Sequence, residues 1–450
     1  MKHFLQFFFA ALILISSCKR ADHNKIFKDA TLYRQTVKKL NDIILINGFP
    51  PCIASRNYAY ANIAAYEVIA AGDTMNYKSL SGQIKHLPMI NKPDKNKTID
   101  FHFASLLAFC KVGNAVTFPE GSMDEYVNSL KEKASNVGMA SEVLENSIHF
   151  ADVVALHILD WSKNDNYAQT RSAPKYTVTN EDGRWIPTPP MFTQALEPHW
   201  GEIRPMALNS VEEISLPVDP VPFNIKNKDS QFYKNVMEVK TTGDNLTQEQ
   251  KDIADFWDDI PLKLNTSGHL RYMTKKFSPG GHWMNIVGIA TEMNKDDFNS
   301  TVSIYTQTSI ALFDAFISCW YLKFKYNYVR PETVINQHIA SDWRPYLETP
   351  PFPEYTAGHA TISSAAEKIL TSVIGDNKAF TDTSQVEFGL KARSFKSFKE
   401  AATEAGISRV YGGIHYRTSC DEGYKNGQEI GQFVLDRLKL KKSKLANVSR

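Results

Sequence analysis

The chain has 450 residues, of which 51 are basic and 49 acidic, and its formal net charge is +2. Hydrophobic residues make up 43% and charged residues 22%, close to the averages of soluble globular proteins, which excludes a disordered chain or a fibrous repeat. Without a basic excess, broad binding to the phosphate backbone of a nucleic acid is not expected. The length allows two or more ordinary domains or one large domain.

The first residues are typical of an export signal. A short basic start precedes a continuous apolar stretch over residues 7–15, which is too short for a comfortable membrane span. The small residues before Cys18 resemble a bacterial lipobox, in which the cysteine is acylated and becomes the new N-terminus. We therefore predict a lipoprotein signal peptide at residues 1–17 and an exported protein of the periplasm or cell envelope. An ordinary signal peptide and a secreted protein are the alternative.

The N-terminal half, predicted at residues 24–235, begins with helices. Apolar residues recur at helical spacing, with few prolines or glycines, over 59–71, 101–112 and 143–161. Nine of the chain's 21 prolines then lie at about 174–222, so regular helices cannot continue there. Because this segment also contains tryptophan and other large apolar residues, we expect an ordered, irregular arm packed over the helices.

Helices are expected to return after residue 247. The predicted segments are 248–257, 283–293, 301–328, 358–373 and 398–410. Strand-like alternation is scarce, so the predicted fold class is all-α, with two helical-bundle halves forming one large domain. The C-terminal catalytic bundle is predicted at 245–440. The internal cysteines contain no CxxC pair, which argues against a cysteine zinc site, and Cys110 and Cys319 are expected to be free and buried.

Two basic residues mark the first of three chemically distinctive segments, KFKYNYVRP at 323–331. Lys323 and Arg330 are seven residues apart, which predicts that they lie nearly on one face of a helix. Pro331 disfavours helical conformation at Arg330, so the helix is expected to end there. Both cations would then lie near the negative end of the helix dipole.

The second segment, PEYTAGH at 353–359, leads into a helix. Helix N-termini present free N–H groups and partial positive charge, which bind anions. Gly358 allows an anion to approach the backbone closely, and His359 is expected in the first turn beside it. An ordinary helix start with an incidental histidine is the alternative.

The third segment is SRVYGGIH at 408–415. Its two glycines are expected to end a helix and to place His415 just beyond it. With Arg409, the three segments supply three cations, which would repel a divalent metal and suit a tetrahedral oxyanion. Of the two histidines, one can bond covalently to the central atom and the other can act as an acid or base.

In this order, the three segments resemble the signature of the type 2 phosphatidic acid phosphatase and vanadium haloperoxidase superfamily. Further segments are similar to bacterial vanadium-dependent haloperoxidases, so that the resemblance covers nearly the whole chain after the signal. These segments are 55–67, 183–190, 200–205, 256–257 and 279–283.

The resemblance implies that vanadate is the cofactor. It implies that His415 is the axial ligand of vanadium and that the three cations neutralise the equatorial oxygens. His359 is then the acid–base residue that helps hydrogen peroxide replace an oxygen. The positive charge of Lys323 can add to the polarisation of the peroxide. The implied catalytic residues are His359, Lys323 and His415. The implied cofactor-binding set is Lys323, Arg330, Ala357, Gly358, His359, Arg409 and His415.

The implied reaction is the oxidation of a halide by hydrogen peroxide to a hypohalous species. Iodide is the first expectation because it is the easiest of the common halides to oxidise, and bromide is the second. Small organic acceptors are further candidate substrates. A phosphomonoesterase, with His415 as nucleophile, and a non-catalytic oxyanion-binding protein are the alternatives.

Two positions depart from the usual pattern. Ala357 stands where the family usually has serine, and losing one hydrogen bond to a charged group costs about 1.5–3 kcal/mol. We therefore expect weaker vanadate retention or altered turnover. The aspartate often found four residues after the last histidine is Ser419, so Asp421 or a backbone carbonyl is expected to orient His415.

Five further residues are secondary candidates. Phe352 and Trp283 could form walls of a halide pocket or pack in the core, and His282 could face the site. Asp258 and Asp259 are expected to be a solvated pair, with the bracing of an arginine as the alternative.

Overall fold

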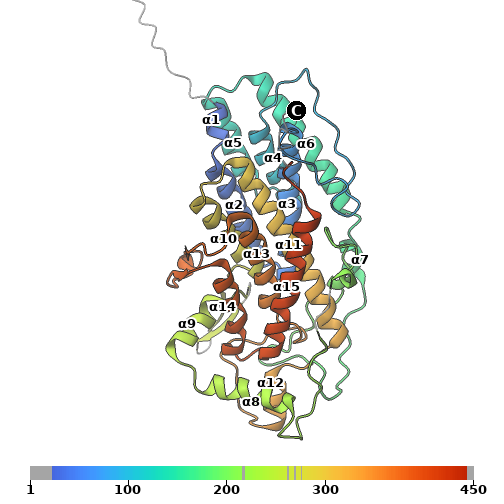
Figure 1. The fold of residues 1–450 in the computed structure, drawn as a ribbon, viewed down its shortest axis with the longest axis vertical. Helices are drawn as coiled ribbons and strands as arrows, with labels where there is room; N and C mark the ends of the chain where they lie inside the picture. The colour runs from blue at the N-terminus through green and yellow to red at the C-terminus, as the bar shows by residue number, and fades with distance from the viewer. Residues whose placement is uncertain (1–22, 215–217, 261–262, 268–269, 275, 443–450) are drawn as a thin grey trace, which may run out of the picture.

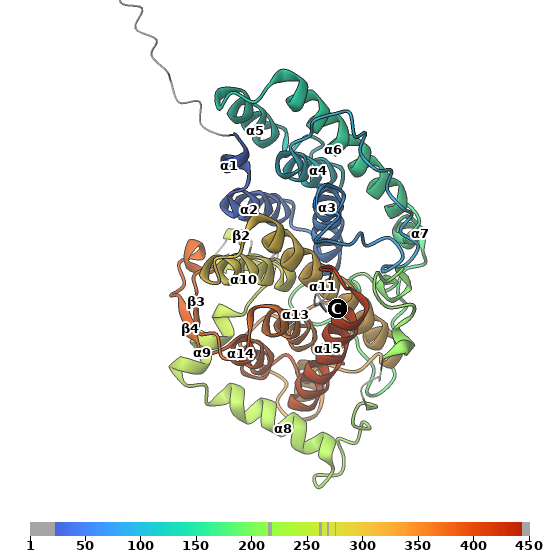
Figure 2. The same ribbon diagram turned by 45° about the horizontal axis from the view of Figure 1, so that its top comes forward.

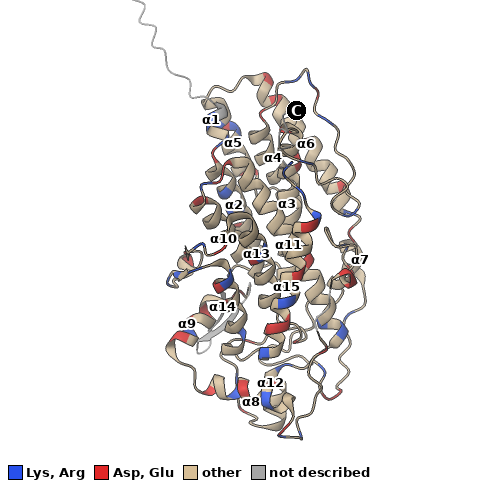
Figure 3. Cartoon of the chain, viewed as in Figure 1, with Lys and Arg blue, Asp and Glu red and all other residues tan. Residues whose placement is uncertain are grey.

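The computed structural model describes residues 23–214, 218–260, 263–267, 270–274 and 276–442. They form an elongated molecule built almost entirely of helices (Figure 1), which confirms the predicted all-α class. The strands among these residues form two separate two-stranded antiparallel sheets. The predicted signal peptide at 1–17 and Cys18 lie outside the described residues. Acidic and basic positions are interspersed along the described chain (Figure 3).

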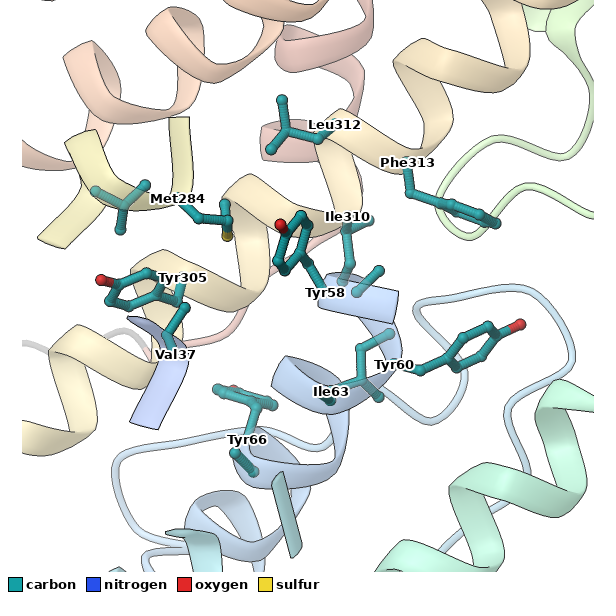
Figure 4. Packing of buried hydrophobic residues seen from close by; sticks show 14 of the residues in the cluster. Val37, Tyr58, Tyr60, Ile63, Tyr66, Met284, Tyr305, Ile310, Leu312 and Phe313 are labelled. Atoms are coloured by element: carbon teal, nitrogen blue, oxygen red, sulfur yellow. The ribbon is translucent and has the colours of Figure 1, made fainter. Parts of the chain in front are cut away.

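Seven helices and an irregular arm make up the first part of the chain. The helices are α1 (His23–Phe27), α2 (Ala30–Asn47), α3 (Pro51–Gly72), α4 (Phe101–Ala115), α5 (Asp124–Asn136), α6 (Ser141–Ser162) and α7 (Tyr167–Ser172). Helix α3 is buried on all sides between α4, α6 and α11. Its many alanines allow these neighbours to approach closely, while its larger side chains fill the spaces between them. Figure 4 shows Tyr58, Ile63 and other residues of α3 beside Ile310 of α11.

The proline-rich arm crosses the helical body without an α-helix between residues 173 and 214. It contains the short 3-10 turns η1 (Trp200–Glu202) and η2 (Val211–Glu213). Trp185 and Trp200 are fully buried. Asp314 on α11 accepts three backbone hydrogen bonds, of 2.7–3.0 Å, from the N–H groups of residues 206–208. The prediction of an ordered arm packed on the helices is therefore confirmed.

The second part of the chain surrounds α13. Its elements are α8 (Gln231–Asp244), α9 (Gln248–Phe256), β1 (Lys263–Ser267), β2 (Leu270–Thr274), α10 (Pro279–Met293), α11 (Phe298–Tyr326), α12 (Pro331–His338), α13 (Gly358–Ile374), β3 (Phe380–Asp382), η3 (Val386–Phe388), β4 (Arg393–Phe395), α14 (Phe398–Tyr411) and α15 (Arg417–Arg437). Helix α13 packs against α10, α11, α14 and α15 (Figure 2).

The long helix α11 joins the two parts. It packs against α2 and α3 on one side and against α10, α13 and α15 on the other, so that one hydrophobic core runs through both parts. The predicted division into 24–235 and 245–440 remains a prediction. Its first boundary falls within α8, a helix that the sequence did not reveal.

The expectation that Lys323 and Arg330 share a helix is wrong. Helix α11 ends at Tyr326 because Asn327 adopts the left-handed conformation, with φ of 47°, and its N–H donates to the carbonyl of Lys323 at 2.8 Å. Arg330 instead immediately precedes α12, and Pro331 occupies the first turn of that helix, where its fixed φ is favourable. The turn between the two helices still keeps both cations in the same buried region.

Candidate active site

The three sequence segments meet at the ends of α11, α13 and α14. Gly358 and His359 begin α13, Arg409 lies in the last turn of α14, and His415 follows that helix. These four residues line one pocket. Lys323, Arg330 and Ala357 are fully buried next to it. The structure therefore brings together every residue of the predicted site.

The pocket has a volume of about 300 Å³, with a polar floor and mainly apolar walls. The walls come from three separate stretches of chain, at residues 48–51, 191–196 and 348–352, with Phe316 and Trp320 of α11. Phe352 is thus a wall residue, as one alternative predicted. Trp283 instead packs in the core, where its Nε1 donates to the Ser363 hydroxyl at 2.8 Å.

His415 is held between an acidic and a basic side chain. Its Nδ1 lies 2.8 Å from Glu354 Oε1, and its Nε2 lies 3.0 Å from Arg330 Nη1. Because a guanidinium only donates, Nε2 must be the accepting nitrogen, and the ring proton resides on Nδ1. Burial lowers the pKa of His415 well below its ordinary value, and the three neighbouring cations lower it further. In this neutral form the Nε2 lone pair accepts from Arg330 Nη1, and a neutral imidazole nitrogen is also the form that binds a metal.

Glu354 is the functional residue that the sequence analysis missed. Its Oε1 also accepts from the Tyr416 N–H at 3.0 Å, and its Oε2 accepts from the Ser419 hydroxyl at 2.7 Å. Burial raises its pKa to about 7. Asp421, which the sequence suggested for orienting His415, is exposed on α15. The available signal was a lone carboxylate inside the PEYTAGH segment.

The two cations nearest the loop before α13 have different bonding. Lys323 Nζ donates to the carbonyls of residues 353, 354 and 356 at 3.0, 3.0 and 2.5 Å, and burial lowers its pKa to about 8. Its ammonium group therefore ties this loop to α11. Arg330 donates from Nε to the Phe352 carbonyl and from Nη1 to the Ile414 carbonyl. Its Nη2 is buried and has no hydrogen-bond partner in the protein.

His359 is mostly buried, and its Nε2 also lacks a hydrogen-bond partner. The nearest acid is Asp259, whose Oδ2 lies 3.7 Å away, beyond hydrogen-bonding distance. Burial and the Arg409 guanidinium lower the pKa of His359 to about 4, while the Asp259 carboxylate opposes this shift. The imidazole is therefore neutral near pH 7.

The prediction of a solvated Asp258–Asp259 pair is wrong. Both carboxylates are buried. Lys276 Nζ lies 3.7 Å from Asp258, and His282 and Gln385 hold Asp259. Arg409 donates from Nη2 to the backbone carbonyl of residue 257 at 2.6 Å. The chain turns inward here, and charge pairing offsets part of the cost of burying the acids.

These residues fit a tetrahedral oxyanion. Arg330 Nη2 and His359 Nε2 are buried polar atoms without a protein partner, a state that native proteins rarely leave uncompensated. A side-chain carbon added at Gly358 would meet only Cys319 Sγ and the Trp320 ring, both at 4.0 Å. Gly358 thus leaves room for a ligand at the start of α13, where the first N–H groups have no partner within the helix, and three buried cations favour an anion there.

Comparisons with known proteins agree with this chemistry. A family model described as the VCPO second helical-bundle domain matches residues 303–442. The crystal structure of the first bacterial vanadium-dependent iodoperoxidase shares 42% sequence identity, covering 92% of this chain and 98% of that chain, with a TM-score of 0.87.

A bacterial vanadium-dependent chloroperoxidase has the same fold at lower similarity. Its holo form shares 17% identity, covering 86% of this chain and 92% of that chain, with a TM-score of 0.64. Its apo form shares 17% identity, covering 87% and 94%, with a TM-score of 0.63. No curated protein matches the sequence. On the extent and identity of the iodoperoxidase match, this chain belongs to the vanadium-dependent haloperoxidases, enzymes whose cofactor is vanadate.

Proposed function

We propose that this haloperoxidase oxidises iodide in preference to bromide, with hydrogen peroxide as the oxidant. The observation that carries this proposal is the 42% identity to an iodoperoxidase over nearly the full length of both chains. The polar floor of the pocket can receive the halide and peroxide, and its apolar walls suit a small organic acceptor for the hypohalous product.

In this proposal, His415 Nε2 is the protein ligand of vanadium. Arg330 Nη2 and Arg409 compensate the charge of the oxygens, and the Gly358 N–H donates a hydrogen bond. When bound, vanadate would act as a Lewis acid that polarises peroxide, and the oxidation state of vanadium would not change. Lys323 contributes charge from behind the loop at 353–356, because backbone carbonyls already accept from its ammonium group.

His359 is assigned the transfer of protons. Its lowered pKa keeps the ring unprotonated at neutral pH, so that it can accept a proton from incoming hydrogen peroxide. It would then give that proton to the oxygen that hydrogen peroxide replaces, so that this oxygen can leave as water. The distance to Asp259 leaves Nε2 free for both steps.

The decisive assay measures peroxide-dependent oxidation of iodide and bromide after vanadate loading, beside hydrolysis of a generic phosphoester. We expect halide oxidation, faster with iodide. Phosphoester hydrolysis without peroxide-dependent iodination would instead support a phosphomonoesterase. Inactivity in both assays that persists in Ala357→Ser would support a non-catalytic oxyanion-binding protein.

We also propose that the enzyme is exported and anchored by a lipid on Cys18. The basis is the short apolar signal followed by small residues and this cysteine. Within the described ranges, no helix is long and apolar enough to cross a membrane. In the native host, Cys18→Ser should move the protein from the membrane fraction to the soluble fraction. Retention of the variant in membranes would contradict the anchor.

A further inference from the structure

A buried charged cluster lies next to His359, and one of its members, Asp259, also lines the pocket. Its centre is His282 in the first turn of α10, with no solvent exposure. The Nδ1 of His282 lies 3.0 and 3.1 Å from the two carboxylate oxygens of Asp259. The Nε2 lies 2.8 Å from Asp382 Oδ2, at the end of β3. Three separate segments of the chain therefore meet at one imidazole.

Both nitrogens of His282 face carboxylates, so both must donate, and the ring is an imidazolium. The two acids raise its pKa to about 10 against the effect of burial. Gln385 Nε2 donates to Asp259 Oδ1 at 2.9 Å and lies 3.1 Å from His282 Nδ1, because both groups converge on the same carboxylate. The ring also stacks on Trp257, with centroids 4.6 Å apart.

The acid on the far side is fixed as well. Asp382 Oδ1 accepts from the Ser384 N–H at 2.9 Å and from the Ser384 hydroxyl at 2.6 Å. The small β3–β4 sheet thus delivers a carboxylate that cannot rotate freely, and this carboxylate locks the plane of His282. Asp259, bound on the opposite edge of that ring, is held in turn.

This arrangement matters for His359 because Asp259 lies only 3.7 Å from its Nε2. A buried carboxylate at this distance, if its charge were not shared, would strongly favour the protonated imidazole. The imidazolium at His282 neutralises part of that charge and fixes the carboxylate just beyond hydrogen-bonding distance. The other charged groups that act on His359 are Arg409, which disfavours its protonation, and Asp258, which favours it. His415 is a further titratable neighbour.

We propose that His282 and Asp382 are positioning residues that act on His359 through Asp259: they hold this carboxylate beside the ring, at a distance where it does not keep the ring protonated. The link to catalysis rests on the proposed acid–base role of His359. The effect of His282 and Asp382 on the protonation of His359 does not rest on that role, because it concerns the protein without vanadate.

The test follows histidine resonances by NMR during pH titration of the vanadate-free, full-length chain. The His359 resonance is assigned by its absence from the spectrum of His359→Gln. The resonance of His102, which is remote in the N-terminal helices, is the internal control. In the wild type, we expect His359 to titrate at about pH 4. In His282→Gln, the unshared charge of Asp259 should raise that midpoint by about one pH unit or more.

Asp382→Asn keeps the size of the side chain and removes the other acid. It should move the His359 midpoint to lower pH, and by less, because a more distant negative charge is lost. Opposite shifts with an unchanged His102 would support the proposal. An unchanged His359 midpoint, or equal shifts in both variants, would overturn it. If His282→Gln does not fold, as judged by circular dichroism, the direction of the Asp382→Asn shift decides alone.

The link to catalysis is tested on vanadate-loaded enzyme. The acid limb of kcat/KM for halide should move to higher pH in His282→Gln. The reason is that His359 becomes protonated, and so stops acting as a base, at a higher pH in this variant. If the NMR midpoint moves and the rate profile does not, the positioning of His359 stands and its proposed acid–base role fails.

Discussion

The two histidines of the site each face a buried carboxylate, but the two regions are built differently. Glu354 lies 2.8 Å from His415 Nδ1, whereas Asp259 lies 3.7 Å from His359 Nε2. The short contact fixes the tautomer of His415 and directs one lone pair. The longer contact leaves His359 Nε2 without a fixed partner. A carboxylate beside a histidine thus suits the proposed ligand role of His415 in one region and the proposed acid–base role of His359 in the other.

The two carboxylates also differ in what surrounds them. Burial raises the pKa of Glu354 to about 7. The His282 and His359 rings instead lower the pKa of Asp259 below its usual range, overcoming the effect of burial. Asp259 therefore stays ionised over a wide pH range, while the charge of Glu354 depends on its neighbours. Removing either histidine or either carboxylate should separate these roles.

The largest effect is expected from His415→Ala. The variant loses the nitrogen proposed to bond to vanadium, so vanadate binding and halide oxidation should both be abolished. Equilibrium dialysis followed by metal analysis measures the bound vanadium, and His338→Ala is the control outside the site. Binding at wild-type affinity in His415→Ala would exclude this residue as the ligand.

His359→Ala should separate binding from turnover. We expect kcat to fall by about 10²–10⁴, the usual contribution of a general acid–base group, while vanadate is still retained. Steady-state iodide oxidation at saturating vanadate, with the same dialysis measurement, checks both parts. Loss of vanadate equal to that in His415→Ala would mean that the two histidines share one role.

Glu354→Gln should weaken vanadate binding by about 10–100-fold, as is typical when the group that orients a metal-bound histidine is changed. The neutral amide is a weaker acceptor for His415 Nδ1 and leaves its ring less firmly held. Asp421→Asn is the matched control and should have no effect. The reverse result would return the orienting role to Asp421.

The smallest effect is expected from Ala357→Ser. A hydroxyl at this position adds one hydrogen bond to a charged group, which corresponds to about tenfold tighter vanadate binding at the lower end of the expected energy. Ala357→Gly, which adds no hydroxyl, should not give this gain. If both variants bind vanadate as the wild type does, the residue before α13 does not limit retention.

The residues proposed to hold the anion were predictable because they lie in short segments. The glycine and histidine at 358–359 show a helix start, and Arg409 with His415 brackets a helix end. The supporting carboxylates were not predictable in the same way. Glu354 meets a histidine 61 positions away, and Asp382 meets one 100 positions away. Such pairs depend on how α10, β3 and the loop before α13 pack, which local patterns do not record.

Two errors in the sequence-based predictions have clear physical causes. Asn327 ended α11 early by adopting a left-handed conformation that few residues other than glycine adopt easily, and nothing in the apolar spacing signalled it. Asp258 and Asp259 were expected in solvent because paired acids are usually exposed. Here partners from distant elements, including His282, lie within hydrogen-bonding or ion-pair distance, so burial is tolerated.

The origin of the pocket walls has a consequence for how this enzyme can change. The floor is made by helix ends in α13 and α14, whereas the walls come from residues 48–51, 191–196 and 348–352. Mutations in the first two wall stretches lie more than 100 positions from the residues of the floor. Evolution or directed engineering can therefore vary the size and polarity of the pocket walls while the residues of the floor stay unchanged.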